Sequence, residues 1–304
     1  MKNEKAFGFH PASLTALFIL GNSVIIFPQK NANEYSFLAY IISAIAAVVI
    51  YIVFSPLVKK LFLAQQSRNL KPYKKVLLLI LYLSVAALSL SVATETFIDF
   101  SYFAFKIILN DLTPVLSFLC FFAVIVYFAF KRQENFLKFC LLAFFFTAAV
   151  IVIFFLLCIK DYRIQNIFVF APPSYKTLFT QIKDYALNPT AAVLLIAVYE
   201  TGVFGKIRKK ASVYGIISGF ALLGLCLLNS LLLFGSKLAA LLDYPYASAI
   251  STVTVGRLFT RLDGFSYFVY FTSCLTKITV CIFIIRYILK NCNLLLKNTN
   301  FYTN

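Results

Sequence analysis

Long apolar runs separated by short polar loops make up most of this chain. Each run approaches about 20 residues, the length of an α-helix that crosses the hydrocarbon core of a bilayer. The pattern therefore predicts an all-α polytopic membrane protein with about eight transmembrane helices in a single transmembrane domain over residues 1–304. The expected spans cover residues 11–27, 36–58, a third run starting near 76, and then 114–130, 136–159, 189–204, 214–234 and 264–289.

The first apolar run is interrupted in its middle by Gly21, Asn22 and Ser23. These residue types form helix poorly, and the polar ones readily bond to freed backbone groups. An interruption inside the hydrocarbon region is tolerated only where it is buried in protein or lines a watery cavity. The sequence therefore predicts that the first helix is broken and that the break binds a ligand.

A second polar interruption lies in the helix expected over 189–204. It consists of Tyr199, Glu200, Thr201 and Gly202. Two broken helices that lie five apart are typical of inverted five-helix repeats, in which half-helix ends bind an anionic group and unwound carbonyls bind a cation or an ammonium group. The alternative is that the glycines only permit close helix packing.

Ionisable residues inside spans are the next candidates for function. Glu200 would cost about 3 kcal/mol at the bilayer centre unless it is paired or solvated, and Lys277 in the last span is the obvious partner. Ser273 belongs to a hydroxyl-rich face around that lysine, which either lines the site or bonds harmlessly to its own helix. Glu95 shares a helix face with Asp99. The pattern is equally compatible with a ligand-binding role and with a contact at the entrance of the site or with a partner.

Two glycines spaced four apart, Gly215 and Gly219, lie in the run over 214–234. Small residues at this spacing let two helices approach closely. We expect this face to serve packing inside the bundle rather than a dimer contact. Proline is also placed as a helix start, because Thr113 and Pro114 form a good N-terminal pair for the span that follows.

The formal net charge of +17 comes from 28 Lys and Arg residues that lie mostly in the short loops. With the N-terminus inside, 18 of them fall on the inner side and nine on the outer side. This asymmetry predicts that both termini are cytoplasmic. The charge therefore reports membrane orientation and does not indicate a nucleic-acid partner.

Cysteine and histidine usage argues against metal and cofactor sites. The seven cysteines are scattered through apolar segments without a CxxC pair, and the chain has one histidine. This pattern is typical of small buried side chains rather than of metal ligands or a disulfide framework. No catalytic constellation is present, so we expect neither an enzyme nor a bound cofactor.

Several segments together carry a family resemblance. They are ALFILGNSVIIFP at 16–28, TETFIDF followed by LTP across 94–114, IQNIFVF at 164–170 and YPYASAISTVTVGRLFTRLDGF at 244–265, with Lys277 downstream. The series resembles the GerAB family, the B subunits of spore germinant receptors. This family belongs to the amino acid, polyamine and organocation transporters, which share the LeuT-like inverted-repeat fold.

The resemblance implies a ten-helix subunit of the spore inner membrane that recognises a nutrient germinant, usually an amino acid, and works with an A subunit and a lipoprotein C subunit. It implies a first repeat over 11–159 and an incomplete second repeat over 175–290, with the last two helices expected to be missing. By this analogy Gly21, Asn22 and Ser23 line the ligand pocket together with the segment Tyr199 to Gly202. The sequence departs from the family at Thr94, where a basic residue is usual, and in the loop KRQENFLKF.

Three functions remain open at this stage. The first is a germinant-receptor subunit that binds an amino acid at the helix breaks and passes a packing change to its partners. The second is an amino acid permease of the cell membrane, and the third is a shortened paralogue that acts only as a scaffold. The missing helices favour sensing over flux, because alternating access usually rocks one repeat against a complete partner.

Overall fold

The computed structural model describes residues 3–21, 23–26, 35–65, 72–108, 114–166, 175–202, 209–252 and 263–297. Every element that these residues form is a helix, and the candidate residue Asn22 lies outside them. The elements are α1 (Asn3–Leu20), α2 (Ser23–Ile26), α3 (Ser36–Gln65), α4 (Pro72–Phe103), the π-helix η1 (Ala104–Ile108), α5 (Pro114–Phe130), α6 (Gln133–Leu157), the 3-10 helices η2 (Cys158–Asp161) and η3 (Ile164–Asn166), α7 (Tyr175–Gly202), α8 (Lys209–Leu241), α9 (Pro245–Ser251) and α10 (Asp263–Lys297).

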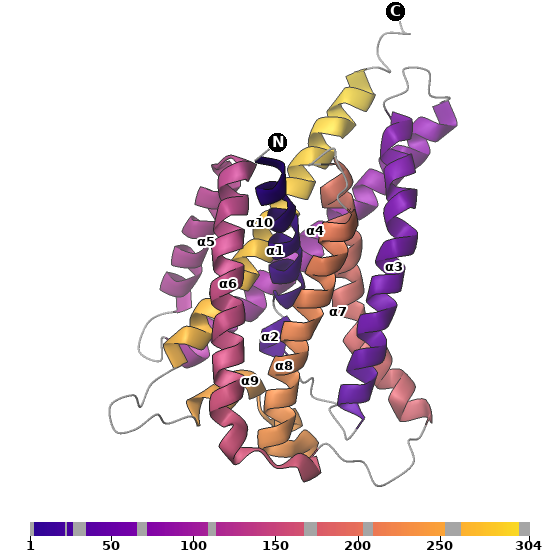
Figure 1. Cartoon of the computed structure of the whole chain (residues 1–304). Helices are drawn as coiled ribbons and strands as arrows, with labels where there is room; N and C mark the ends of the chain where they lie inside the picture. Colours follow the sequence, from indigo (N-terminus) through magenta and orange to yellow (C-terminus); the bar gives the residue numbers. More distant parts are fainter. Residues whose placement is uncertain are drawn as a thin grey trace, which may run out of the picture.

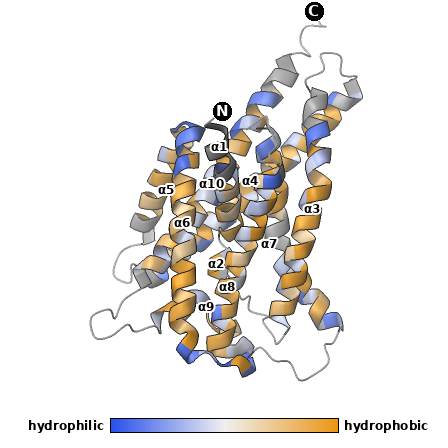
Figure 2. Ribbon diagram, in the orientation of Figure 1, coloured by the Kyte–Doolittle hydropathy of each residue, from blue (hydrophilic) through white to orange (hydrophobic). Residues whose placement is uncertain are grey.

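The long helices form one bundle and run roughly along a common direction, with both termini at the same end (Figure 1). Among the described residues, five helices are long and apolar enough to cross a membrane, and α1, α5 and α7 each contain a shorter apolar stretch. Apolar residues follow the shafts of the helices, whereas polar residues gather at the two ends of the bundle (Figure 2). The prediction of an all-α polytopic membrane protein is therefore confirmed.

Helix α1 lies at the centre of the bundle and packs against α6, α8 and α10. Its residues from Ala16 to Leu20 are at most 1% exposed. Gly215 and Gly219 of α8 make the close approach possible, because a Cβ atom at Gly215 would lie only 2.4 Å from the carbonyl oxygen of Ala12. The expected packing role of these two glycines is confirmed.

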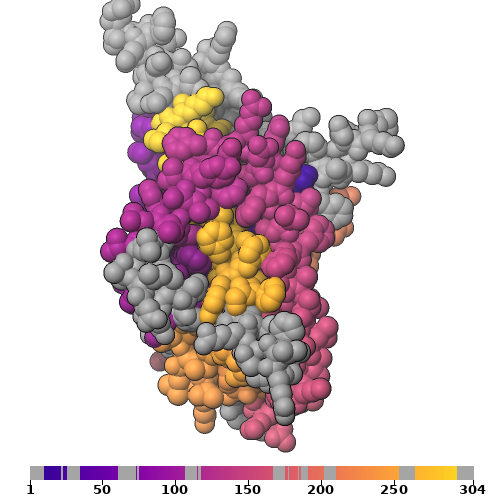
Figure 3. Space-filling model, turned by 90° about the vertical axis from the view of Figure 1, so that its left-hand side faces the viewer, coloured from indigo at the N-terminus to yellow at the C-terminus, as the bar shows by residue number. Residues whose placement is uncertain are grey.

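The peripheral helices α3 and α4 present large apolar side chains outward. Ile45 and Ile52 on α3 and Leu83 and Leu90 on α4 are among the exposed residues. A lipid-facing surface needs no polar cover, so such exposure is the normal state of a transmembrane helix. Helix α10 is mostly buried, yet its first turns reach the surface between α5 and α6 (Figure 3).

Helix α7 corrects two expectations. The sequence predicts a span that begins near residue 189, but α7 begins at Tyr175 and runs without interruption to Gly202. Pro189 lies inside it, and a proline removes only one backbone hydrogen bond, which a packed helix can absorb. The predicted interruption at residues 199–202 is wrong, because α7 remains helical through all four of them.

Helix α8 also extends beyond its predicted end at Phe234 and continues to Leu241 through a kink at Gly235, which has φ +73°. One turn before the kink, the carbonyl of Leu232 accepts hydrogen bonds from the backbone N–H of Arg163 at 3.1 Å and from Nδ2 of Asn166 at 3.0 Å. The connection after α6 is therefore docked onto the bend of α8.

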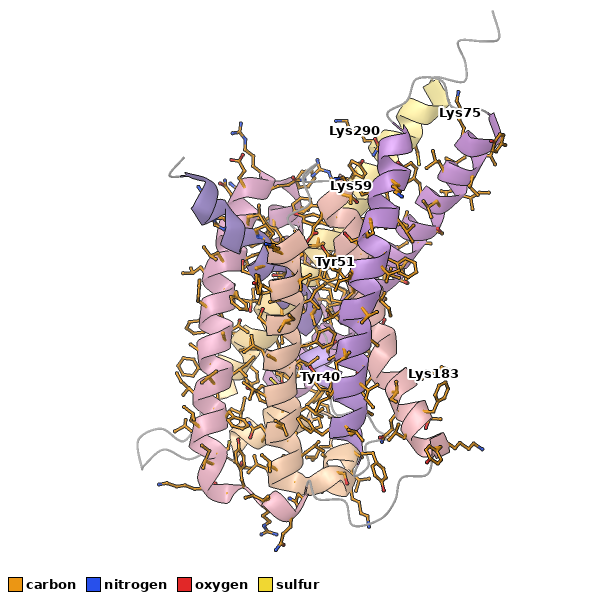
Figure 4. The ribbon with its side chains drawn as sticks, turned by 45° about the vertical axis from the view of Figure 1, so that its right-hand side comes forward. Tyr40, Tyr51, Lys59, Lys75, Lys183 and Lys290 are labelled. Carbon is orange, nitrogen blue, oxygen red and sulfur yellow. The ribbon has the colours of Figure 1, made fainter. Side chains whose placement is uncertain are left out.

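Charged side chains mark the two ends of the bundle. Lys59, Lys75 and Lys290 lie at the end that carries the termini, whereas Lys183 lies near the opposite end (Figure 4). The short helix α9 also lies at this opposite end, which we call the outer end (Figure 1). Lys106 of η1 forms an ion pair there with Asp243, just before α9.

Candidate functional site

The first predicted break is present. Helix α1 ends at Leu20 and α2 begins at Ser23, and Gly21 between them has φ +29°. The N–H of Gly21 still donates to the carbonyl oxygen of Leu17 at 2.9 Å, so the chain leaves the helix directly after this bond. A residue with a side chain is strained at this φ, so the backbone itself requires glycine here.

Lys277 of α10 lies across this break. A Cβ atom at Gly21 would come within 2.4 Å of Cδ of Lys277 and 3.1 Å of the carbonyl oxygen of Phe18. The lysine side chain is only 3% exposed. Glycine is thus needed for space as well as for conformation, because the break has to accommodate the stem of a buried lysine.

Within the described ranges, the side-chain contact of the Gly21 carbonyl is long and shared. Oγ of Ser273 on α10 lies 3.3 Å from this oxygen, but the same hydroxyl lies 2.6 Å from the carbonyl oxygen of Val269 and 3.2 Å from that of Tyr270. One hydroxyl proton cannot serve three acceptors well, and the shortest contact is to Val269. The lone pairs of the Gly21 carbonyl therefore remain suited to a further donor.

Two carboxylates act on the lysine from the neighbouring helix. Glu95 and Asp99 of α4 attract Lys277 electrostatically, and α10 packs along α4. Glu95 is exposed and Asp99 is half-buried. Ser273 and Lys277 thus lie at Gly21, whereas Glu95 and Asp99 act on the lysine from α4.

Glu200 has different neighbours from those expected. Its Oε2 accepts a hydrogen bond from the hydroxyl of Tyr51 on α3 at 2.6 Å, and its Oε1 accepts one from the hydroxyl of Ser212 on α8. Tyr51 points from α3 toward α8 in Figure 4. The contacts of Glu200 share no residue with those at Gly21, so the expected pairing with Lys277 is replaced by a clamp of two hydroxyl groups.

The other residues of the 199–202 segment point to separate surroundings. Tyr199 is fully buried and stacks against Phe283 of α10, with 6.5 Å between the ring centroids. The hydroxyl of Thr201 donates to the carbonyl oxygens of Ala197 and Val198 in its own helix. Back-bonding of this kind satisfies a threonine without a ligand. Tyr199, Glu200 and Thr201 therefore contact different parts of the bundle.

The hydroxyl-rich face of α10 is divided between two helices. The hydroxyl of Thr272 lies 3.3 Å from that of Thr147, and the hydroxyl of Thr276 lies 3.9 Å from the thiol of Cys140, both on α6. Ser273 faces α1 instead. Among the described residues, no group of three or more His, Cys, Asp or Glu residues is placed to hold a metal ion.

Tyr51 and Ser212 escaped the sequence analysis. Each is one hydroxyl residue in an apolar run, and nothing in its local spacing separates it from residues that bond to their own helix. A buried carboxylate needs donors from somewhere, so Glu200 predicted that partners exist but not which helices supply them.

The comparisons with known proteins add a family. Residues 9–300 match the family described as "Spore germination protein". A search among curated proteins found no match. The matched segment includes both sides of the α1 break and Lys277.

Proposed function

This chain belongs to the family of spore germination proteins, and from that premise we propose that it is the membrane subunit of a nutrient germinant receptor. In this proposal an amino acid-like germinant binds at the α1 break. The observation that carries it is the buried Lys277 side chain lying across Gly21 at positive φ. A broken central helix with a cation beside it offers both kinds of contact that a zwitterion needs.

The two ends of the ligand have separate partners. The Lys277 ammonium attracts the ligand carboxylate, with the backbone at Ser23 beside it. The ligand ammonium donates to the Gly21 carbonyl, whose bond with Ser273 is long and shared. The carboxylates of Glu95 and Asp99 offset the second positive charge.

The position of α1 supports signalling. It contacts α6, α8 and α10 at once, so a ligand that changes the packing at Gly21 acts on three helices. Packed interiors respond to such a change by shifting as units. We propose that this shift is passed through the membrane-facing helices to an A subunit and a lipoprotein C subunit.

The broken first helix also supports a placement in the membrane and in a repeat. We propose that residues 11–159 and 175–290 correspond to two inverted repeats of a LeuT-like bundle. The basic residues at the end that carries both termini support an orientation with that end in the cytoplasm of the spore inner membrane.

An amino acid permease is the second candidate. A discontinuous helix beside an intramembrane charge is also how secondary transporters build a substrate site. A permease would move the amino acid across the membrane, whereas a receptor subunit needs only to bind it.

Deletion of the gene in its source organism separates the two functions. Germination of spores on single amino acids and uptake of the same amino acids by growing cells would be measured side by side, with the wild-type gene restored as the control. We expect germination to be lost and uptake to stay normal. Lost uptake with normal germination would establish a permease.

A further inference from the structure

A group of buried polar side chains lies outward of the break, beneath α9. It comprises Tyr246 on α9, Tyr270 on α10 and Asn229 on α8, which we call the outer tyrosine cluster. Each of the three is at most 1% exposed. The rings of the two tyrosines meet edge to face with centroids 6.4 Å apart.

The cluster has hydrogen-bonding capacity that the described residues leave unused. The hydroxyls of Tyr246 and Tyr270 and Nδ2 of Asn229 have no partner in hydrogen-bonding geometry within the described ranges. The thiol of Cys226 interacts with the Tyr246 hydroxyl and that of Cys158 with the Asn229 side chain, but a thiol is a weak partner. Buried polar groups are normally satisfied, so these three groups have hydrogen-bonding capacity left for a bound molecule.

The geometry connects the cluster to the proposed ligand site. Tyr270, Ser273 and Lys277 follow one another at helical spacing on one face of α10, and Ser273 reaches the Gly21 carbonyl. Helix α9 packs against α2, α8 and α10, so it covers the outer side of the break. A ligand held at Gly21 by its ammonium and carboxylate would therefore extend its side chain toward the two tyrosines.

The surroundings of the cluster are neutral. The groups that act electrostatically on the two tyrosine hydroxyls are thiols and other phenols, with Cys158 and Tyr267 among them. Phe103 closes one side, with its ring centroid 4.4 Å from that of Tyr270. Asp99 acts on the neighbouring Cys274 and Tyr244, but within the described ranges the groups that act on the two tyrosine hydroxyls are neutral, so a neutral donor or acceptor fits them best.

We propose that the outer tyrosine cluster binds the side chain of the germinant and selects amino acids whose side chains carry a neutral hydroxyl or amide. This inference rests on the proposed function and names its ligand class. Entry requires α9 to move. The ion pair between Lys106 and Asp243 that holds its start is exposed, and an exposed pair stabilises little.

Two pairs of nearly isosteric amino acids test the selection. The full-length chain would be purified in lipid nanodiscs, and binding of L-threonine would be compared with L-valine, and L-asparagine with L-leucine. We expect the polar member of at least one pair to bind about 10-fold more tightly or better, because its loss leaves buried donors unpaired. Equal binding within both pairs would overturn the inference.

Phenylalanine substitutions test whether the two tyrosine hydroxyls cause the preference for polar ligands. Tyr246→Phe removes a hydroxyl that has only a weak thiol partner among the described residues, and Tyr270→Phe removes one outside hydrogen-bonding geometry there, so the fold should persist. We expect each variant to reduce the preference for the polar ligand. Tyr214→Phe, an exposed tyrosine on α8, is the matched control and should leave it unchanged. A preference kept by both variants would assign the hydroxyls to bound water and overturn the inference. No binding of any amino acid would instead overturn the proposed function, and the inference with it.

Discussion

In the part of the chain that the structure describes, two helices turn at a glycine of positive φ, α1 at Gly21 and α8 at Gly235. At Gly235 the space is filled by the neutral amide of Asn166, whose Cγ would lie 3.4 Å from a Cβ atom at that position. The same amide donates to the Leu232 carbonyl. The bend in α8 therefore has a matched, uncharged partner from its own chain.

At Gly21 the space is filled by a cation. A Cβ atom at Gly21 would lie too close to the side chain of Lys277, and among the described side chains the Gly21 carbonyl receives a shared hydroxyl. The two glycines share their conformation, so conformation does not distinguish a bend from a site. The difference is that a neutral amide fills the bend at Gly235, whereas a buried cation lies at Gly21 and favours a ligand.

The strongest test removes the charge at Gly21. Lys277→Met keeps an apolar stem but leaves the ligand carboxylate without its cation, so we expect affinity to fall by about 2–5 kcal/mol, or roughly 30-fold to several thousand-fold. Binding in nanodiscs would be compared with Lys290→Met, an exposed lysine on the same helix. Unchanged affinity in Lys277→Met would show that Gly21 is a structural bend like Gly235 and not a ligand site.

Alanine at the two glycines compares the breaks directly. Gly21→Ala meets both a strained φ and the Lys277 stem, and we expect about 2–4 kcal/mol of lost stability together with lost binding. In Gly235→Ala the new Cβ atom would lie 3.4 Å from Asn166, which is an ordinary contact, so the cost is the backbone strain. We expect about 1–2 kcal/mol of lost stability with binding retained. Thermal unfolding and ligand titration of both variants are the measurements. Equal effects on binding would remove the distinction.

Glu200→Gln tests whether the hydrogen bonds from Tyr51 and Ser212 to Glu200 contribute to ligand binding. Glutamine keeps one acceptor oxygen for Tyr51 and Ser212 in place of two, so we expect a loss of about 1–3 kcal/mol in stability with ligand affinity retained. Glu134→Gln, on the exposed start of α6, is the control. The sequence alone favours the opposite result, lost response with intact folding, and that outcome would bring Glu200 back into the ligand site.

The smallest effect is expected at the bend of α8. Asn166→Ala removes the side-chain donor to the Leu232 carbonyl, while the N–H of Arg163 still serves it. We expect about 1 kcal/mol of lost stability in thermal unfolding and unchanged ligand affinity. A large loss of binding would show that the α8 bend is coupled to the site.

The sequence predicted the features that local chemistry controls. Gly21 was identified because it stands beside Asn and Ser in an apolar run, and the start of α5 was predicted at Pro114, where it is found. Gly235 was missed, because Gly after an apolar run also signals a helix end, which is how the run to Phe234 was interpreted. Helix α8 continues past Gly235, where Asn166 from a distant segment docks against the kink, and local sequence does not reveal that contact.

The same limit applies to the candidate site. Lys277 was singled out as a buried charge, but its proximity to Gly21 depends on how α10 packs, which spacing along one helix does not give. Glu200 was identified as costly to bury, yet its donors come from two other helices. Tertiary packing also kept α7 helical where Glu-Thr-Gly suggested a break. Local pattern thus identified the unusual residues, and packing decided which of them meet.

The central place of α1 has a consequence for biogenesis. This helix is synthesised before its three main neighbours, and α10, which supplies Ser273 and Lys277, is the last helix of the described chain. Chains are made from the N-terminus at about 5–20 residues per second, so the break must wait seconds or longer for its partner. The segment around Gly21 therefore crosses this interval without Ser273 and Lys277, and the proposed site is complete only when α10 arrives.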